Sequence, residues 1–529
     1  MPLRKTRPER HGVYDYIVVG AGSGGAAVAA RLARNPAVTV LLVEAGGSDF
    51  RLDTRAPAAF GEQFHKKGDW DYFTQPEPAA ANREIHLPRA KVVGGCSAMN
   101  AMLWVRGSDR DFDGWGIDGW SWSDVAPVYD RMEWHFLKSH NQDGPMRINR
   151  IATPDATAIA FVEAAVNAGI VPNDDISGPD LDGVALAPTT TVGGRRWSTA
   201  RGYLDAAIQR PNFDLMTKTL VDRVLITGGR AVGIEVTRRG ATRTIAARGE
   251  VVLSAGAYNT PQLLQLSGIG DASQLRGLGI DVVVDNPQVG AHLKEHPFSF
   301  TNFELNKPWK GLFGVEKNPM HVVNWLRNGT GPLASNVAEA IAHVRTREGL
   351  EVPDMQLVFA PAFFWDNGEA THDKPALSIM QSYWEPRSTG HVRITSKDPR
   401  AAPDILMNML ADPADVEALM RGIELTRRIV AAAPYDEMVS GELNPGPGVR
   451  TPEQLERFIR ETTLHTYHPA CTAGMGRVLD ERLRVEGVAG LRVADASALP
   501  EITHGNTNAP AILFGERCAD FIAADAQAR

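Results

Sequence analysis

The chain has 529 residues, enough for several domains, but no repeat, low-complexity tract or acidic tail divides it into separate modules. Its 55 Lys and Arg against 63 Asp and Glu give a net charge of −8, so we expect no partnership with nucleic acid. No run is apolar enough to span a membrane, and the basic residues at 4–10 lead into a strand pattern without a signal-peptide core. Three scattered cysteines do not form a disulfide framework. We therefore expect a soluble, cytoplasmic protein with one large core or two interlocked domains.

The first motif is a nucleotide-binding turn near the amino end. Residues 15–32 read DYIVVGAGSGGAAVAARL, in which an apolar strand pattern precedes Gly20, Gly22 and Gly25, and a helix of small residues follows. These glycines allow a sharp turn and a close approach to a pyrophosphate, whose charge lies at the positive end of the helix. The next apolar run, VTVLLV, leads to Glu44, at the spacing of a carboxylate that holds ribose hydroxyls. The pattern predicts an adenine dinucleotide, either a flavin or a nicotinamide.

Two further strand-to-helix units follow later in the chain. The first begins with the buried-strand pattern VVLSAG, after which we expect Asn259 or Thr260 to cap a helix with Pro261 at its first position. The second, LRVAD, predicts a strand that ends in the carboxylate of Asp495, and a terminal helix is expected to begin near Asn508. Elements of the nucleotide-binding domain therefore occur at the start, middle and end of the sequence.

A different pattern lies between these units, from about residue 302 to 441. Stretches such as PDMQLVFAPAFF and HVRIT alternate with Pro and Gly, which is typical of an antiparallel sheet. We predict an α/β fold (α+β overall), with a discontinuous Rossmann-like nucleotide-binding domain and an inserted substrate domain built on an antiparallel β-sheet. The expected boundaries are 12–160, 215–300 and 460–525 for the former domain, and 161–214 and 301–459 for the latter. Small-molecule sites favour such domain interfaces.

The segment 89–113, RAKVVGGCSAMNAMLWVRGSDRDFD, contains paired glycines and Asn100, which indicate a close backbone approach to a flat or anionic group. Together with GAYNTPQLLQLSGIG at 256–270, YHPACTAGMG at 467–476 and the segment 491–512, it resembles the glucose-methanol-choline family of FAD-dependent oxidoreductases. The resemblance covers essentially the whole chain. It implies FAD, not a nicotinamide, and oxidation of an alcohol.

The resemblance also implies which residues contact FAD. The flavin ring is expected near residues 95–100, and the ADP portion near the amino-terminal turn. The implied cofactor-binding residues are Gly20, Gly22, Gly25, Glu44, Val93, Gly95, Ser97, Asn100, Val221, Asp495 and Asn508. A helix that begins near Asn508 would direct its positive end toward the flavin and stabilise the reduced form. Met99 stands where some relatives carry a histidine bonded to the flavin, so we expect FAD to be bound non-covalently, with Met99 packed beneath the ring.

Alcohol oxidation needs a group that accepts the hydroxyl proton, and histidine suits this role near neutral pH. By resemblance, His468 is the catalytic base and Asn506 its partner, since an asparagine can orient an alcohol oxygen without titrating. His504 is a less favoured candidate for the partner. We expect the remaining histidines, including His292, His296 and His465, to be structural, and no His/Cys spacing indicates a metal site.

The sequence indicates fewer residues that would select the substrate than residues that would bind the cofactor. An aromatic cluster between Phe359 and Trp365, which includes Phe363 and Phe364, forms either a pocket wall or ordinary core. Glu339 would attract a cation if exposed in the cavity, but we expect a solvated or salt-bridged carboxylate. No aromatic cage for a quaternary ammonium group is evident. The sequence therefore favours oxidation of a primary alcohol to an aldehyde, with oxygen or another electron acceptor, over choline or sugar oxidation. A hydroxynitrile lyase that retains FAD is the alternative of another class, and a nicotinamide dehydrogenase is more remote.

Overall fold

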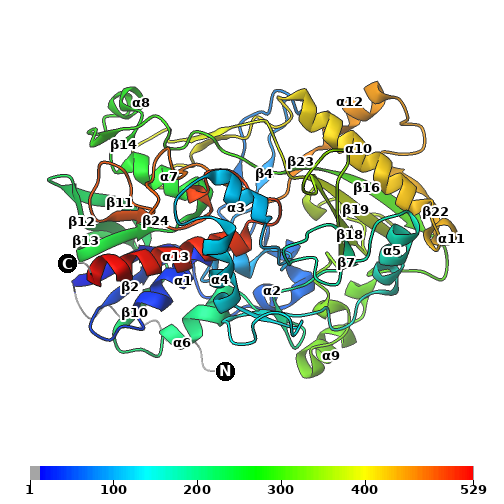
Figure 1. Cartoon of the computed structure of the whole chain (residues 1–529), viewed down its shortest axis with the longest axis horizontal. Coiled ribbons are helices and arrows are strands. Elements are labelled where there is room, and N and C mark those ends of the chain that lie inside the picture. Colours follow the sequence, from blue (N-terminus) through cyan, green and yellow to red (C-terminus); the bar gives the residue numbers. More distant parts are fainter. Residues whose placement is uncertain (1–11, 528–529) are drawn as a thin grey trace.

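The computed structural model describes residues 12–527, which form two large sheets with helices around them (Figure 1). The basic residues at 4–10 lie outside the described residues. The first sheet has a parallel part with the strand order β10 (Phe213–Met216), β2 (Val40–Val43), β1 (Val13–Val19), β13 (Ala241–Leu253) and β24 (Leu491–Val493). The first half of the long strand β13 also pairs with β12 (Arg230–Arg238), which pairs with β11 (Leu220–Thr227); both pairings are antiparallel. All four residues of β2 are buried, because helices and loops cover both faces of the parallel part.

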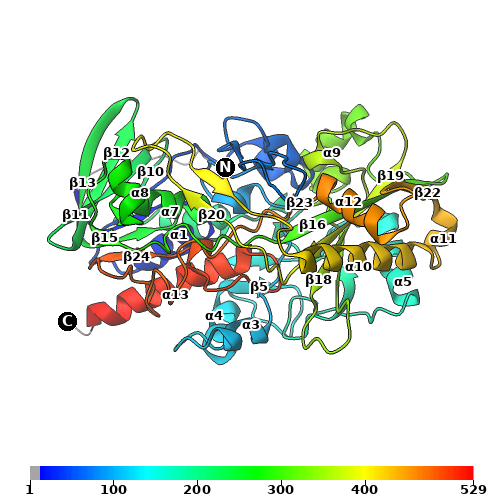
Figure 2. The ribbon, with the colours of Figure 1, turned by 90° about the horizontal axis from the view of Figure 1, so that it is seen from above.

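Two helices from opposite ends of the chain pack together beside this sheet. The helix α1 (Ser23–Leu32) follows the glycine turn, and α13 (Asn508–Gln527) begins at the residue that the sequence predicted. Figures 1 and 2 show α13, in red, running along α1, in blue. A Cβ atom on Gly515 would lie 2.3 Å from the carbonyl oxygen of Gly24, so glycine is needed for this close packing. The contact brings both helix beginnings to one place, where the Ser23 hydroxyl donates to Asn508 Oδ1 at 2.7 Å.

The helix in the middle of the chain begins earlier than predicted. Neither Asn259 nor Thr260 is its cap, because α7 spans Gly256–Leu266 and Pro261 lies inside it. A distant carboxylate explains the difference, since Asp495 accepts hydrogen bonds from the backbone N–H of Gly256 at 2.8 Å and from the Thr260 hydroxyl at 2.6 Å. Pro261 leaves the carbonyl of the fourth residue before it without its helical donor, and the hydroxyl of Thr472 donates to that oxygen at 2.7 Å.

The second sheet is antiparallel and confirms the predicted inserted sheet. Its strands follow the order β22 (Val439–Asn444), β16 (Pro297–Leu305), β19 (Ala376–Tyr383), β18 (Met355–Ala360), β17 (Ala340–Val344) and β7 (Gly183–Leu186), and the short β23 (Leu464–His465) also pairs with β16. The helices α5 (Ala156–Asn167), α10 (Pro413–Val430) and α12 (Pro452–Thr462) lie on the same side of the molecule as this sheet (Figure 2). Each large sheet has its own hydrophobic core.

Shorter elements connect and border the two sheets. They are α2 (Leu52–Arg55), β3 (Tyr72–Phe73), β4 (His86–Leu87), α3 (Asp109–Trp115), α4 (Trp122–Met132), β5 (Glu133–His135), β6 (Met146–Ile148), β8 (Thr191–Val192), β9 (Arg195–Arg196), α6 (Asp205–Ala207), β14 (Ile269–Gly270), α8 (Ala272–Gly277), β15 (Val284–Asp285), α9 (Met320–Asn328), β20 (His391–Arg393), β21 (Asp404–Leu406) and α11 (Tyr435–Met438). Among residues 12–527, no helix has both the length and the apolar character needed to cross a membrane.

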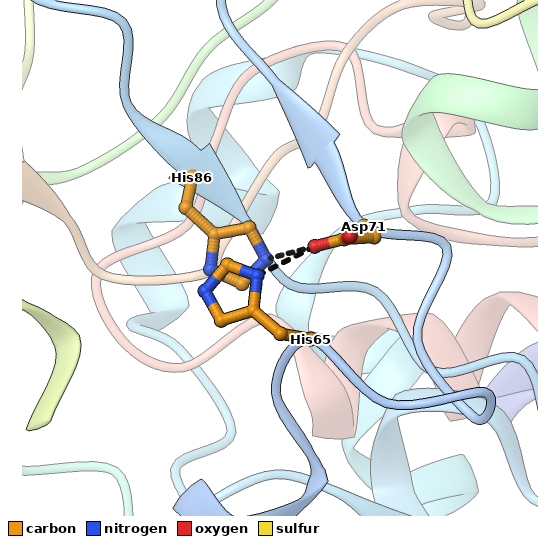
Figure 3. Close-up of side chains that lie close together, drawn as sticks. All are labelled: His65, Asp71 and His86. Atoms are coloured by element: carbon orange, nitrogen blue, oxygen red, sulfur yellow. Dashed lines mark hydrogen bonds and ion pairs between the residues drawn. The ribbon is translucent and has the colours of Figure 1, made fainter. Parts of the chain in front are cut away.

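The loop-rich segment between Glu44 and Pro88, called the covering segment below, is held by a small polar cluster. Asp71 Oδ1 lies 2.7 Å from His65 Nδ1 and 3.1 Å from His86 Nε2 (Figure 3). The two imidazole rings stack, with centroids 3.7 Å apart and planes only 24° from parallel. One nitrogen of each ring therefore faces the same carboxylate oxygen, so the three side chains meet at one point. His65 Nε2 also bonds Glu369 at 2.9 Å, so the cluster joins the covering segment to the inserted domain.

Candidate active site

One cavity is lined by residues of both large sheets and of the covering segment. Ten of the thirteen residues that the sequence assigned to a site line this cavity: Gly20, Gly22, Glu44, Gly95, Asn100, Val221, His468, Asp495, Asn506 and Asn508. The other three lie behind its wall. Gly25 packs against the carbonyl of Gly20, Val93 belongs to the first hydrophobic core, and the Ser97 hydroxyl donates to the carbonyl oxygen of Gly94 at 2.6 Å.

The glycines of the amino-terminal turn serve two different purposes. Gly20 has a φ of +98°, and a Cβ atom there would lie 2.3 Å from the carbonyl oxygen of Ser254. A Cβ on Gly25 would lie 2.0 Å from the carbonyl oxygen of Gly20. By contrast, a Cβ on Gly22 would approach no protein atom closer than 3.8 Å and would occupy part of the cavity itself. The protein's own packing requires Gly20 and Gly25, whereas the free space beside Gly22 fits a pyrophosphate against the start of α1.

Glu44 lines the cavity directly after β2. Its carboxylate accepts hydrogen bonds from the backbone N–H groups of Ala21 at 2.9 Å and Gly46 at 2.7 Å, and burial raises the pKa of Glu44 to about 7. Val221, from β11, lines the same cavity. A buried carboxylate that is fixed by the turn itself is well placed to accept the hydroxyl groups of a ribose.

The start of α13 carries an unpaired polar group. Asn508 Nδ2 is buried and has no hydrogen-bond partner among the described residues, although its Oδ1 accepts from Ser23. An orphaned amide donor at the positive end of a helix suits an acceptor group of a bound cofactor. Asp495 is different, because its two oxygens already accept from Gly256, Thr260 and Ser497. It holds the wall of the cavity in shape.

His468 and Asn506 meet beside this cavity. Asn506 Nδ2 lies 3.0 Å from His468 Nε2, and the backbone N–H of His468 donates to Glu295 Oε1 at 2.8 Å. Burial, together with the nearby Arg89 guanidinium and His465, lowers the pKa of His468 to about 3. The ring is therefore neutral, and a neutral imidazole can accept a proton.

The other histidines differ in their surroundings. His504 lies 2.5 Å from Asp111, and although burial disfavours its charge, the carboxylates of Asp111 and Glu385 raise the pKa of His504 to about 10. It does not line the cavity. His296, which the sequence assigned to a structural role, contacts the site directly, because its Nδ1 lies 3.1 Å from His468 Nδ1. The segment KEHP at 294–297 resembles a family segment near the flavin, and this was the signal that could have identified His296.

His292 and His465 bond elsewhere. His292 Nε2 lies 2.7 Å from Glu501, and His465 Nε2 lies 2.9 Å from the carbonyl oxygen of His86.

The second sheet supplies an apolar wall on one face. Side chains alternate between the faces of a strand, and the cavity-lining residues of β16, β18 and β19 follow this period of two. They are Phe298, Phe300, Val358, Ala360, Ser378 and Met380. Phe359 points to the opposite face, where it packs against Phe161 with ring centroids 5.2 Å apart. Of the predicted aromatic cluster, Phe364 lines the cavity and Phe359 belongs to the core.

Glu339 is neither solvated nor salt-bridged, contrary to expectation. It is 1% exposed, accepts from the Ser335 hydroxyl at 2.5 Å and from the backbone N–H of Asp155 at 2.6 Å, and does not line the cavity. Burial raises the pKa of Glu339 to about 7. Neutral donors replace water around this carboxylate, which joins the loop before β17 to the start of α5. No sequence signal indicates the contact with Asp155, because that residue lies 184 positions earlier in the chain.

Comparison with known proteins agrees with this geometry. Family models described as GMC oxidoreductase match residues 14–298 and 386–515, which together make up most of the chain. The chain belongs to the GMC oxidoreductase family. This membership supports FAD as the cofactor that the glycine turn, Glu44 and the unpaired Asn508 amide fit, and oxidation of a CH–OH type donor as the class of reaction.

Similar GMC proteins differ in their named activities. A GMC-type oxidoreductase of Mycobacterium tuberculosis (strain ATCC 25618 / H37Rv) is 40% identical over 96% of this chain and 99% of its own length. An oxygen-dependent choline dehydrogenase of Paraburkholderia xenovorans is also 40% identical, over 96% of this chain and 94% of its own. The solved structure of a formate oxidase from Aspergillus oryzae RIB40 has a TM-score of 0.91 at 25% identity and covers 98% of this chain and 99% of its own. The choline dehydrogenase and the formate oxidase are thus named for different substrates.

Proposed function

We propose that this GMC protein oxidises an uncharged primary alcohol to an aldehyde with FAD, and passes the electrons to oxygen or another acceptor. The observation that carries the proposal is the neutral pair of His468 and Asn506, 3.0 Å apart, beside a cavity whose second-sheet wall is apolar. When bound, FAD supplies a hydride acceptor at its N5 atom. Side chains of the protein orient the alcohol and accept its hydroxyl proton.

Asn506 and His468 have different roles toward the hydroxyl group of the alcohol. Asn506 Nδ2 donates a hydrogen bond to the alcohol oxygen and so holds it in place. His468 Nε2 accepts the hydroxyl proton. Its low pKa keeps Nε2 unprotonated and able to accept, and the hydroxyl proton becomes strongly acidic as the hydride leaves the carbon. The apolar wall excludes water from the reacting atoms.

The wall of the cavity favours an uncharged substrate over choline. Choline remains the second candidate because similar proteins are named choline dehydrogenases. However, Glu44 and Asp495 are the only carboxylates among the described residues that line the cavity, and both lie with the proposed cofactor residues. Glu339 is fully hydrogen-bonded behind the wall. A quaternary ammonium group would therefore lose its hydration without gaining a counter-charge.

We further propose that FAD is bound without a covalent link, because Met99 lines the cavity and a thioether cannot form the bond that a histidine makes in some relatives. We retain 12–160, 215–300 and 460–525 as the FAD-binding domain and 161–214 and 301–459 as the substrate domain. Two of these limits lie a few residues after the start of a strand. The strand β10 of the first sheet begins at Phe213, before the limit at 215, and β16 of the second sheet begins at Pro297, before the limit at 301. All three cysteines are free thiols, which supports a cytoplasmic location.

An anaerobic substrate panel tests the proposal. Holoenzyme is mixed without oxygen with benzyl alcohol, a straight-chain primary alcohol, choline or glucose, and the flavin absorbance is followed. We expect bleaching by one of the first two and slower or no bleaching by choline. Addition of oxygen or a dye then identifies the acceptor. Bleaching by choline alone would reject the uncharged substrate class, and cleavage of a cyanohydrin with the flavin still oxidised would identify a lyase.

A further inference from the structure

A chain of hydrogen bonds continues behind Asn506 into the second sheet. Asn506 Oδ1 lies 3.4 Å from Gln356 Nε2, which lies 3.0 Å from His343 Nε2. His343 Nδ1 in turn lies 3.0 Å from the backbone carbonyl oxygen of Leu181. Gln356 and His343 are both fully buried, and they are direct cross-strand partners in β18 and β17. They occupy the same sheet face as the cavity-lining Val358.

The carbonyl oxygen of Leu181 determines which group donates in each of these hydrogen bonds. A backbone carbonyl can only accept, so His343 Nδ1 carries the proton and donates to Leu181. Burial lowers the pKa of His343 to about 3, so the ring is neutral and its Nε2 is an acceptor. Gln356 must then present its amide nitrogen to His343. The second hydrogen of that nitrogen is available to Asn506, which must turn its oxygen toward Gln356.

The same direction extends to the catalytic pair. With its oxygen toward Gln356, Asn506 presents Nδ2 to His468 Nε2, which must accept. His468 therefore carries its proton on Nδ1 and donates it to His296 Nδ1 at 3.1 Å. This is the tautomer whose Nε2 lone pair faces the place proposed for the alcohol. An Asn506 side chain turned by half a rotation would place an oxygen against that lone pair.

We propose that Gln356 and His343 are positioning residues that fix the amide orientation of Asn506 and, through it, the tautomer of His468. Neither residue touches the proposed reacting atoms, and the role rests on the proposed function of His468 and Asn506. The Gln356 oxygen has no partner among the described residues, so the two bonds of its nitrogen are the contacts that orient its amide. The Trp384 ring, 4.6 Å from the His343 ring, packs against that histidine.

Two sets of variants test the proposal in the holoenzyme. Gln356→Glu keeps the shape of the side chain but replaces the donor with acceptors, so Asn506 should turn its nitrogen toward position 356. His343→Gln retains an acceptor for Gln356, whereas His343→Leu removes it at similar volume. Gln381→Leu is the matched control, because Gln381 is a buried strand glutamine that bonds Thr301 and Thr426 instead.

The main measurement is ¹⁵N NMR of labelled histidine, which distinguishes a proton on Nδ1 from one on Nε2 and needs no substrate. We expect the His468 signal, assigned by its loss in His468→Ala, to change from Nδ1–H toward Nε2–H in Gln356→Glu and in His343→Leu. It should stay unchanged in His343→Gln and in Gln381→Leu. Anaerobic flavin reduction by the best alcohol should slow about 10- to 100-fold in the first two variants and recover in His343→Gln.

Failure of the proposed function can be distinguished from failure of the positioning role of Gln356 and His343. If no alcohol reduces the wild-type flavin, the proposed function is wrong, but the NMR comparison still decides the role of the chain of hydrogen bonds. An unchanged His468 tautomer in Gln356→Glu overturns the proposal. If Gln356→Glu does not fold, equal signals in His343→Gln and His343→Leu overturn it as well, because a role in packing alone would not distinguish an acceptor from a methyl group.

Discussion

Replacement of Gly22 by alanine separates what the cofactor requires from what the fold requires. Gly22 lies immediately before α1 with φ −80° and ψ −161°, which alanine adopts without strain. Its new Cβ would lie 3.8 Å from the nearest protein atom, an ordinary contact. We therefore expect the free energy of unfolding of the apoprotein to change by no more than about 0.5 kcal/mol. The methyl group would nevertheless fill the space proposed for the pyrophosphate, so FAD affinity should fall by about tenfold or more, equivalent to about 1.4 kcal/mol.

The assay has two parts and a matched control. FAD affinity is measured by titration of apoprotein, and stability by urea unfolding of the same preparation. Gly47→Ala is the control, because Gly47 lies outside the cavity and a Cβ there would meet only the end of the Lys218 side chain at 3.7 Å. Gly20→Ala should instead lose stability, since its Cβ would lie 2.3 Å from a carbonyl oxygen. Parental FAD affinity in Gly22→Ala would refute the placement of the pyrophosphate.

Further predictions concern catalysis, cofactor attachment and acid stability. His468→Ala should retain FAD but slow anaerobic flavin reduction by about 10²- to 10⁴-fold, and an unaltered rate would remove His468 from the mechanism. Asn506→Ala should slow the same step less, by roughly 5- to 150-fold, with partial recovery in Asn506→His; parental reduction in the alanine variant would make Asn506 structural. Acid precipitation should release the flavin into the supernatant because Met99 cannot form a covalent link, and colour in the pellet would contradict this. Because the pKa of buried His343 is lowered to about 3, its contribution to stability is complete above pH 6.5 and is lost as the pH falls toward 3. Urea unfolding of His343→Gln should therefore lose less stability than the parent between about pH 7 and about pH 5, by roughly 2 kcal/mol, and equal losses would reject the buried neutral state.

The glycine turn, the buried strands and the start of α13 could be predicted from the sequence, because each depends on short-range preferences of the backbone. The glycine turn is visible because Gly20 adopts a positive φ and Gly25 meets a backbone oxygen, so the residue type itself records the geometry. Apolar runs predicted the buried strands, and the start of α13 at Asn508 followed from local helix signals. The family motifs supplied His468 and Asn506, whereas physical reasoning alone could not have selected His468 from the fourteen histidines.

Only the tertiary structure decided which groups meet across the fold. The start of α7 depends on Asp495, which is 239 residues from the Gly256 N–H that it accepts. The face of the second sheet on which Phe359 lies depends on its place in β18, whereas Phe364 reaches the cavity from the loop after that strand. Glu339 accepts from a helix start that is 184 residues earlier. The direction of hydrogen bonds at His468 follows from a carbonyl in another segment. Sequence patterns report short-range backbone preferences, whereas partners of buried polar groups are set by long-range packing, because a buried donor or acceptor must be satisfied by whatever segment lies against it.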